Sequence, residues 1–145
     1  MGNVSGNRSI IEVIVVDGHP SVREGLAAYL DTLEDMSLIA AASTGNTAVE
    51  LCVRHRPDVV LLDLLNSGVD GIPTMHAIHQ ALPDVPIIAM VGWWQHELAE
   101  AALEAGAVTS LDKDVSGELL ARAVRRAVGT HDDRSDALQP GDRRS

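Results

Sequence analysis

The chain is poor in cysteine, lysine and aromatic side chains. Its 145 residues include one cysteine, two tryptophans, one tyrosine and no phenylalanine. The single cysteine, Cys52, excludes a disulfide within the chain and is typical of a reducing compartment. With 21 acidic against 11 basic residues, the formal net charge is −10. This balance argues against a dominant contact with nucleic acid or an anionic membrane, because such contacts need clustered basic side chains.

Long apolar runs are also missing. Residues 1–9 have no apolar core of signal-peptide length, and no segment approaches the roughly 20 apolar residues that span a bilayer. We therefore expect a cytoplasmic protein without membrane contact. Residues 1–9 are expected to be a disordered N-terminus.

The chain does contain alternating apolar runs and amphipathic stretches. The runs predict five short buried strands, at residues 10–16, 37–43, 57–63, 85–92 and 107–111. Apolar residues at helical spacing follow each run, which predicts an α/β fold with a five-stranded parallel sheet. Right-handed crossovers between such strands favour a doubly wound, flavodoxin-like sheet of order 2-1-3-4-5.

The end of the domain is predicted from the last helix. Ser116 is a candidate N-cap, and the apolar pattern continues to Val128. The residues expected to be buried are Leu119, Ala123, Val124 and Ala127. After Gly129 the sequence is polar and shows no sustained period. We expect one domain over residues 10–129 and a linker or disordered tail over 130–145.

Three charged residues follow the ends of different predicted strands. Asp17 follows the first, Asp63 ends the third, and Lys113, the only lysine in the chain, follows the fifth. In the order 2-1-3-4-5, a site forms outside the carboxyl ends of the first and third strands. Two carboxylates and an ammonium there suit phosphoryl transfer to a carboxylate. Asp63 would be the nucleophile, a divalent cation would bind the acids, and Lys113 would neutralise phosphoryl oxygens.

Several segments resemble receiver domains of bacterial two-component response regulators of the NarL/LuxR type. In chain order they are VVDGHPSVREGL, RPDVVLLDL, VDG, ALEAGA and LDKDVSGELLARAVRRAV. The resemblance covers residues 10–129 and implies phosphorylation of Asp63 by a histidine kinase. Such domains usually precede a DNA-binding domain, so the resemblance also implies control of transcription, with DNA bound only by a separate output domain. The losses described below lead us to expect a non-enzymatic role for this chain.

The sequence departs from that family's pattern around the expected site. The family has a second acid, the direct metal ligand, where this chain has Gly18, and a Ser or Thr hydroxyl where it has Val91. Ser110 replaces an aromatic residue that normally reports the switch, and Asn66-Ser67 replaces a Met-Pro pair.

These losses predict a degenerate site. Without an acid at position 18, the oxygen donors left for Mg²⁺ are Asp17, Asp63 and the carbonyl of Leu65. Val91 cannot donate the charge-assisted hydrogen bond, worth about 1.5–3 kcal/mol, that a hydroxyl would offer a phosphoryl oxygen. We expect either no cofactor or weakly bound Mg²⁺. We expect the domain to act by protein association, as a homodimer. Two alternatives stay open: a working phosphoacceptor at Asp63, and a pocket that senses a small ligand.

Other side chains near the site have competing interpretations. Lys113 either pairs structurally with Asp63 or keeps a role toward phosphate. We expect His19 to cap the first helix rather than to bind a metal, because imidazole suits magnesium poorly. His76 and His79, one helical turn apart, have the spacing of a metal pair but are expected on a solvated face.

Trp93 and Trp94 are the only tryptophans and follow the fourth predicted strand. The favoured interpretation is that one indole fills the space left by the small Ser110. The other is that an exposed indole forms an interface for a protein partner or a small ligand, since tryptophan is enriched at the centres of interfaces.

Overall fold

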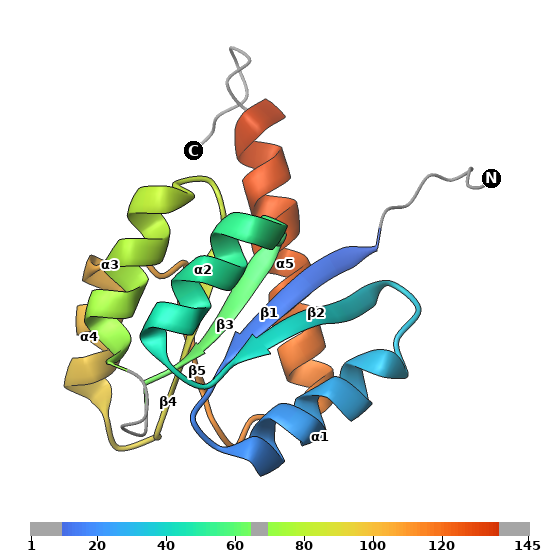
Figure 1. The fold of residues 1–145 in the computed structure, drawn as a ribbon, viewed down its shortest axis with the longest axis horizontal. Coiled ribbons are helices and arrows are strands. Elements are labelled where there is room, and N and C mark those ends of the chain that lie inside the picture. Colours follow the sequence, from blue (N-terminus) through green and yellow to red (C-terminus); the bar gives the residue numbers. More distant parts are fainter. Residues whose placement is uncertain (1–9, 65–69, 137–145) are drawn as a thin grey trace.

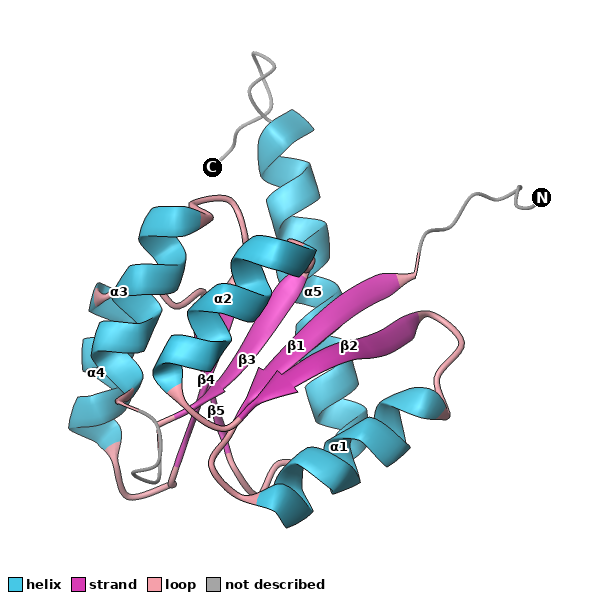
Figure 2. Ribbon diagram, viewed as in Figure 1, coloured by secondary structure: helices cyan, strands magenta, loops and turns pink. Residues whose placement is uncertain are grey.

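The computed structural model describes residues 10–64 and 70–136, with side chains up to residue 129. These residues form one parallel sheet covered by helices on both faces (Figures 1 and 2). The strands are β1 (Ile11–Val16), β2 (Met36–Ala42), β3 (Val59–Asp63), β4 (Ile87–Val91) and β5 (Thr109–Asp112). The helices are α1 (Pro20–Asp31), α2 (Gly45–His55), α3 (Gly71–Ala81), α4 (His96–Glu104) and α5 (Gly117–Asp136).

The strand order is β2-β1-β3-β4-β5, which confirms the predicted topology. β1 pairs in parallel with both β2 and β3, and β4 pairs with β3 and β5. The five predicted strands therefore exist, with ends shifted by a few residues. The predicted third and fourth strands included Pro57 and Pro86, but β3 begins at Val59 and β4 at Ile87. Proline has no N–H to donate to the strand ladder.

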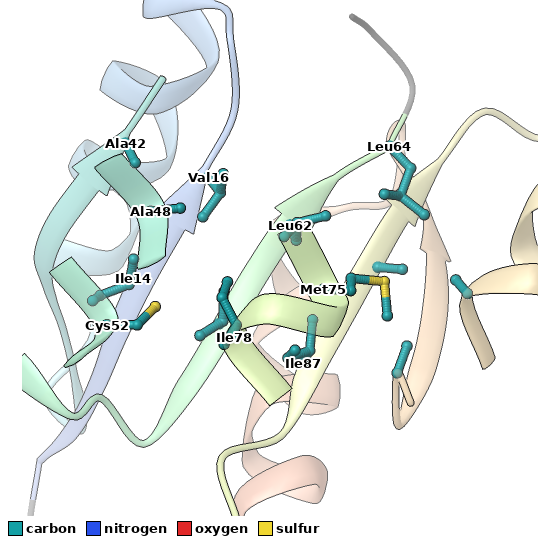
Figure 3. Close-up of a cluster of buried hydrophobic side chains, with 14 of the residues drawn as sticks. Ile14, Val16, Ala42, Ala48, Cys52, Leu62, Leu64, Met75, Ile78 and Ile87 are labelled. Atoms are coloured by element: carbon teal, nitrogen blue, oxygen red, sulfur yellow. The ribbon is translucent and has the colours of Figure 1, made fainter. Parts of the chain in front are cut away.

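Alternate residues of the central strands supply two separate cores. Ile14 and Val16 face the cluster under α2, α3 and α4, part of which is shown in Figure 3. Val13 and Val15 face the cluster under α1 and α5. Because side chains alternate along a strand, a continuous apolar run serves both faces at once.

The last helix differs from its prediction in length and in one buried residue. The N-cap is confirmed, since the Ser116 Oγ accepts a hydrogen bond from the N–H of Leu119 at 3.2 Å. However, α5 continues to Asp136, beyond the expected end at Val128. A helical hydrogen-bond ladder needs no apolar pattern once part of the helix is anchored, here through Val124 and Ala127.

Leu119 was wrongly predicted to be buried, since it is 48% exposed. The buried stripe of α5 runs instead through Leu120, Ala121, Val124 and Ala127. Leu119 precedes this stripe and lies at its edge.

No helix among the described residues has the length and apolar character to cross a bilayer. The predicted linker or disordered tail covered residues 130–145, of which 130–136 belong to α5. Residues 137–145, and residues 1–9 that were predicted to be disordered, lie outside the described residues.

Candidate functional site

Asp17, Asp63 and Lys113 meet at the carboxyl edge of the sheet. β1 and β3 are neighbours, so the residue after β1 and the last residue of β3 come together. The Nζ of Lys113 lies 2.7 Å from Oδ2 of Asp17 and 3.1 Å from Oδ1 of Asp63. The sequence thus predicted the right three residues as neighbours, while their roles toward phosphate stay a prediction.

The two carboxylates are almost completely removed from solvent. Asp17 is 2% exposed and Asp63 is 1% exposed. Burying a carboxylate is costly unless an opposite charge lies next to it. The ammonium of Lys113 contacts both acids, so the structural pairing left open by the sequence is present.

Asp17 is held in its ionised form by its neighbours. Burial by itself would raise its pKa, but the hydrogen bond from Lys113 and the backbone N–H of His19, which donates to Oδ1 at 2.9 Å, outweigh this effect. The pKa of Asp17 is therefore lowered from its usual value. Hydrogen bonds to a carboxylate favour its charged form.

Arg23 also supports this turn, although the residue pattern at the strand ends does not predict it. Its Nη1 donates to the backbone carbonyl of Asp17 at 2.7 Å. Because Arg23 lies in the first turns of α1, not at a strand end, the rule that located the other residues does not apply to it. Its position shortly after the turn from β1 was the only available signal.

His19 is the N-cap residue of α1, as predicted, although its side chain takes no part in capping. It occupies the N-cap position with an extended backbone, but its ring makes no capping hydrogen bond. Instead, Nδ1 lies 3.2 Å from Oδ1 of Asp17. The buried negative charge of Asp17 is the stronger partner for an imidazole placed this close to it.

Asp17, His19 and Asp63 together form a group of potential metal ligands. One ligand atom from each lies within 4.8 Å of the other two. This set of two carboxylates and one imidazole fits Mg²⁺ poorly, because Mg²⁺ prefers an octahedron of oxygen atoms. Leu65, whose carbonyl was expected to contribute, and the Asn66-Ser67 pair lie outside the described residues.

The walls of the pocket are mostly apolar. Its lining includes Val15, Leu61 and Met90. Val91, at the end of β4, is not part of this lining; it is buried in the core, and its carbonyl accepts a hydrogen bond from the backbone N–H of Lys113 at 2.8 Å. The cavity lined by Asp17, Asp63 and Lys113 has a volume of about 70 Å³. Sites for small organic ligands usually measure about 300–1,000 Å³, so this cavity is too small for one.

The tryptophan pair does not fill the space near Ser110. Trp93 is 67% and Trp94 57% exposed, so the prediction that one indole is buried there is wrong. The rings meet edge to face, with centroids 5.7 Å apart. Trp94 covers Gly92, where a Cβ atom would lie 2.7 Å from its ring. The lack of a side chain at Gly92 therefore lets the indole lie over the backbone.

His76 and His79 lie on α3 and are both exposed, as expected for a solvated face. They do not belong to the group of ligands around Asp17.

Comparison with known proteins identifies the family. Residues 13–125 match the response regulator receiver domain. The chain belongs to this family. The receiver domain is 37% identical over 118 residues to the transcriptional regulatory protein LiaR of Bacillus subtilis, a match that covers 81% of the chain and 56% of LiaR. It therefore spans little more than half the length of this relative.

Solved structures agree with this assignment. The signal receiver domain of NarL from Mycobacterium tuberculosis is similar with a TM-score of 0.76 and 30% identity, over 83% of this chain and 98% of the other. A LuxR-family response regulator from Aurantimonas sp. SI85-9A1 gives a TM-score of 0.77 and 27% identity, over 84% and 87%. The predicted NarL/LuxR-type resemblance is thus confirmed.

Proposed function

We propose that this receiver domain, a component of two-component signal transduction, is atypical and acts by protein association. In this proposal, phosphorylation of Asp63 is weak or absent, the role is non-enzymatic and the location is cytoplasmic. The observation that carries the proposal is the bridge from Lys113 to both Asp17 and Asp63, at 2.7 and 3.1 Å, beside Gly18 and Val91.

The charges and donors of the site support this proposal. Lys113 is already engaged by two buried carboxylates, so an incoming phosphoryl group would compete with them for the same ammonium. Val91, at the end of β4, has no hydroxyl to offer the added oxygens. The missing charge-assisted hydrogen bond corresponds to about 1.5–3 kcal/mol. Both features disfavour a stable phosphoryl group on Asp63.

A groove on another face supports association. It has a volume of about 680 Å³ and lies between α3, α4, β5 and α5. Leu103, Val108 and Leu119 line it with apolar side chains that are 44–48% exposed. Asp84 and Arg126 line the same groove. A surface with both charge signs can be complementary to itself, as a two-fold contact requires, so we propose a second copy of the chain as its occupant.

Control of transcription is the further part of the proposal. The relative LiaR is a transcriptional regulatory protein. The net charge of −10 disfavours direct DNA binding by this chain. We therefore assign DNA contact to a separate output domain, whose activity would depend on the association state of the receiver.

Phosphorylation is tested by intact-mass measurement after incubation with acetyl phosphate or phosphoramidate, with and without Mg²⁺. We expect no lasting phosphate adduct under either condition. A stable adduct on the wild type that disappears in Asp63→Ala would contradict the proposal.

The second candidate is a working phosphoacceptor phosphorylated by a histidine kinase. It is favoured by one observation, the retained contact of 3.1 Å between Lys113 and Asp63 at the end of β3. The mass experiment decides between the two candidates. The ligand-sensing alternative finds less support, since the cavity at the site measures only about 70 Å³.

Association is tested by sedimentation velocity over a range of concentrations. We expect a monomer–dimer equilibrium that Leu119→Glu shifts to monomer, because the change places a charge in the apolar groove. Val53→Glu is the matched control, since Val53 on α2 is exposed to 47%, close to the 48% of Leu119, but lies outside the groove. A wild type that stays monomeric at high concentration would contradict the dimer.

A further inference from the structure

We propose that the turn between β4 and α4, together with the acidic face of α4, is a docking surface for a basic segment of a partner protein, rich in arginine or lysine. The turn, which follows β4 in Figure 1, carries Trp93 and Trp94, and the acidic face consists of Glu97, Glu100 and Glu104. None of these residues lines the groove proposed for a second copy of the chain. The inference therefore goes beyond the proposed function and does not depend on it.

The two indoles are the most exposed large apolar side chains among the residues that the structure describes. Trp93 is 67% and Trp94 57% exposed. Because their rings meet edge to face with centroids 5.7 Å apart, they form one aromatic patch. Tryptophan is among the residues most enriched where proteins bind each other, and its ring face is the best aromatic partner of a cation. The pair is thus suited to anchor a cationic side chain.

Hydrogen bonds fix the turn that presents the indoles. The backbone N–H of Gly92 donates to Oε1 of Gln95 at 2.7 Å, and the N–H of Gln95 donates to the carbonyl of Gly92 at 2.9 Å. The carbonyl of Gln95 accepts from the N–H of Ala99 at 3.0 Å, which ties the turn to the start of α4. Trp93 and Trp94 lie between these bonded residues. An ordered surface loses less conformational entropy when a partner binds.

α4 presents its three glutamates on the side that faces away from the core. Glu97, Glu100 and Glu104 are all exposed, and their spacing of three and four residues places them on one face of the helix. The opposite side packs on the core through Leu98 and Ala102. At 1.5 Å per residue, the acidic face extends about 10 Å along the helix from the end next to the tryptophans.

The charges of this face have no cation beside them in the described part of the chain. α4 contains no lysine or arginine, and none of the ion pairs among the described residues involves its glutamates. Glutamates three or four residues apart repel each other, and Glu104 lies in the last turn, where the helix dipole disfavours a carboxylate. The acidic face therefore does not stabilise α4 by itself, and a cationic partner would relieve the repulsion.

Charge complementarity selects the occupant. Three carboxylates repel nucleic acid and anionic membranes but attract cations. They are spread over about 10 Å beside the aromatic patch, so a single small ammonium ion can meet only part of the surface. A segment with several arginine or lysine side chains can place one cation on an indole and others along the acidic face.

Binding of hexa-arginine to the full chain, followed by tryptophan fluorescence, tests the inference. Trp93 and Trp94 are the only tryptophans, so the emission reports from the surface itself. We expect saturable binding that weakens as NaCl rises from about 0.05 to about 0.5 M, because salt screens exposed charges. Hexa-citrulline, the uncharged isostere, and tetramethylammonium, a single cation, should each bind at least about tenfold more weakly.

Calorimetry with variants locates the binding surface. Trp93→Ala and the double variant Glu97→Gln/Glu100→Gln should each weaken hexa-arginine binding about tenfold, as truncation of central interface residues does. The matched control is Glu24→Gln/Glu34→Gln, which also removes two exposed charges but on and after α1, on the other face of the sheet. It should leave the affinity unchanged. All these side chains are exposed, so the variants are expected to fold, which circular dichroism verifies.

Several outcomes would overturn the inference. Equal weakening in the α4 double variant and its control would show attraction by net charge without a specific surface. Absence of hexa-arginine binding, full affinity in Trp93→Ala, or equal affinity for hexa-citrulline or tetramethylammonium would each contradict the proposed occupant. Dimer formation is read by sedimentation and phosphorylation by mass, so the failure of the proposed function and the failure of this inference are recognised separately.

Discussion

The ammonium of Lys113 compensates two carboxylates that are almost completely buried, and single atoms around this group decide what the pocket can do. Gly18 supplies no side chain beside Asp17, and Val91, at the end of β4, has no hydroxyl to donate. Both differences are visible in the sequence. The contact of the His19 ring with Asp17 at 3.2 Å is not, because it depends on the rotation of a side chain.

Replacing Gly18 by Asp should create a magnesium site. Gly18 does not have a positive φ, so its backbone accepts a side chain. Without metal, a third carboxylate beside Asp17 and Asp63 should lower the melting temperature. Mg²⁺ at about 100 times its Kd would then add about 2.7 kcal/mol of stability. Thermal unfolding with and without Mg²⁺ measures both effects.

The control for that experiment is Gly25→Asp, because a Cβ at Gly25 would meet no atom within 4 Å. It introduces the same charge on α1, away from the pocket. A Mg²⁺ response of equal size in both variants would show that Gly18→Asp builds no specific site.

Replacing Lys113 by Met should lower the free energy of unfolding by about 3–5 kcal/mol near neutral pH, because it leaves buried carboxylates uncompensated. In the wild type, the pKa of Asp17 lies below its usual 3.8, so its stabilisation is complete above that pH and is lost as pH falls through the lowered pKa. In the variant Asp17 loses the hydrogen bond that lowers its pKa and protonates more easily, so the difference should shrink in acid. Urea unfolding from neutral to acid pH measures it, and a pH-independent difference would contradict the ion pair.

Among the elements, α5 shows how local patterns and tertiary packing share control. Its N-cap Ser116 and the buried Val124 and Ala127 could be predicted from residue type and helical spacing. Its length and the exposure of Leu119 could not, since the neighbours of the helix decide which edge residues are covered. The exact ends of the strands also depend on neighbouring elements, whereas the existence of each strand follows from a continuous β-branched run.

Two changes on α5 should separate its buried anchor from its surface contacts. Leu120 is 3% exposed in the core, and Leu120→Ala should cost about 2–5 kcal/mol. Arg125 contacts Asp35 at 2.7 Å on the surface, and Arg125→Ala should cost at most about 1 kcal/mol. Denaturant unfolding of both variants measures the costs. A larger loss for Arg125→Ala would show that the surface ion pair, not burial, anchors α5.

In the whole molecule, the sheet separates two apolar clusters, and its carboxyl edge collects the charged residues. Ile14 and Cys52 lie in the cluster beneath α2, α3 and α4 (Figure 3). The parallel order brings Asp17 and Asp63, which are distant in sequence, to neighbouring strand ends. The groove near Leu119 lies apart from this edge, on the side of α4 and α5.

The thiol of Cys52 should report on the integrity of the core. Cys52 is fully buried, and burial raises its pKa to about 11. A protonated and inaccessible thiol reacts slowly, because the thiolate is the nucleophile. Ellman's reagent should therefore modify the folded chain only at the rate of unfolding and the denatured chain at once. Fast modification of the folded chain would contradict the packing of α2.

The sequence by itself determined the five strands, their order through the crossover rule, and the three charged residues at the strand ends, because hydrophobic period and residue type act locally along the chain. Only the tertiary structure decided that the His19 ring turns to Asp17, that Trp93 and Trp94 stay exposed, and that α5 buries Leu120 instead of Leu119. These outcomes depend on which side chains and charges meet across elements, and no local pattern contains that information.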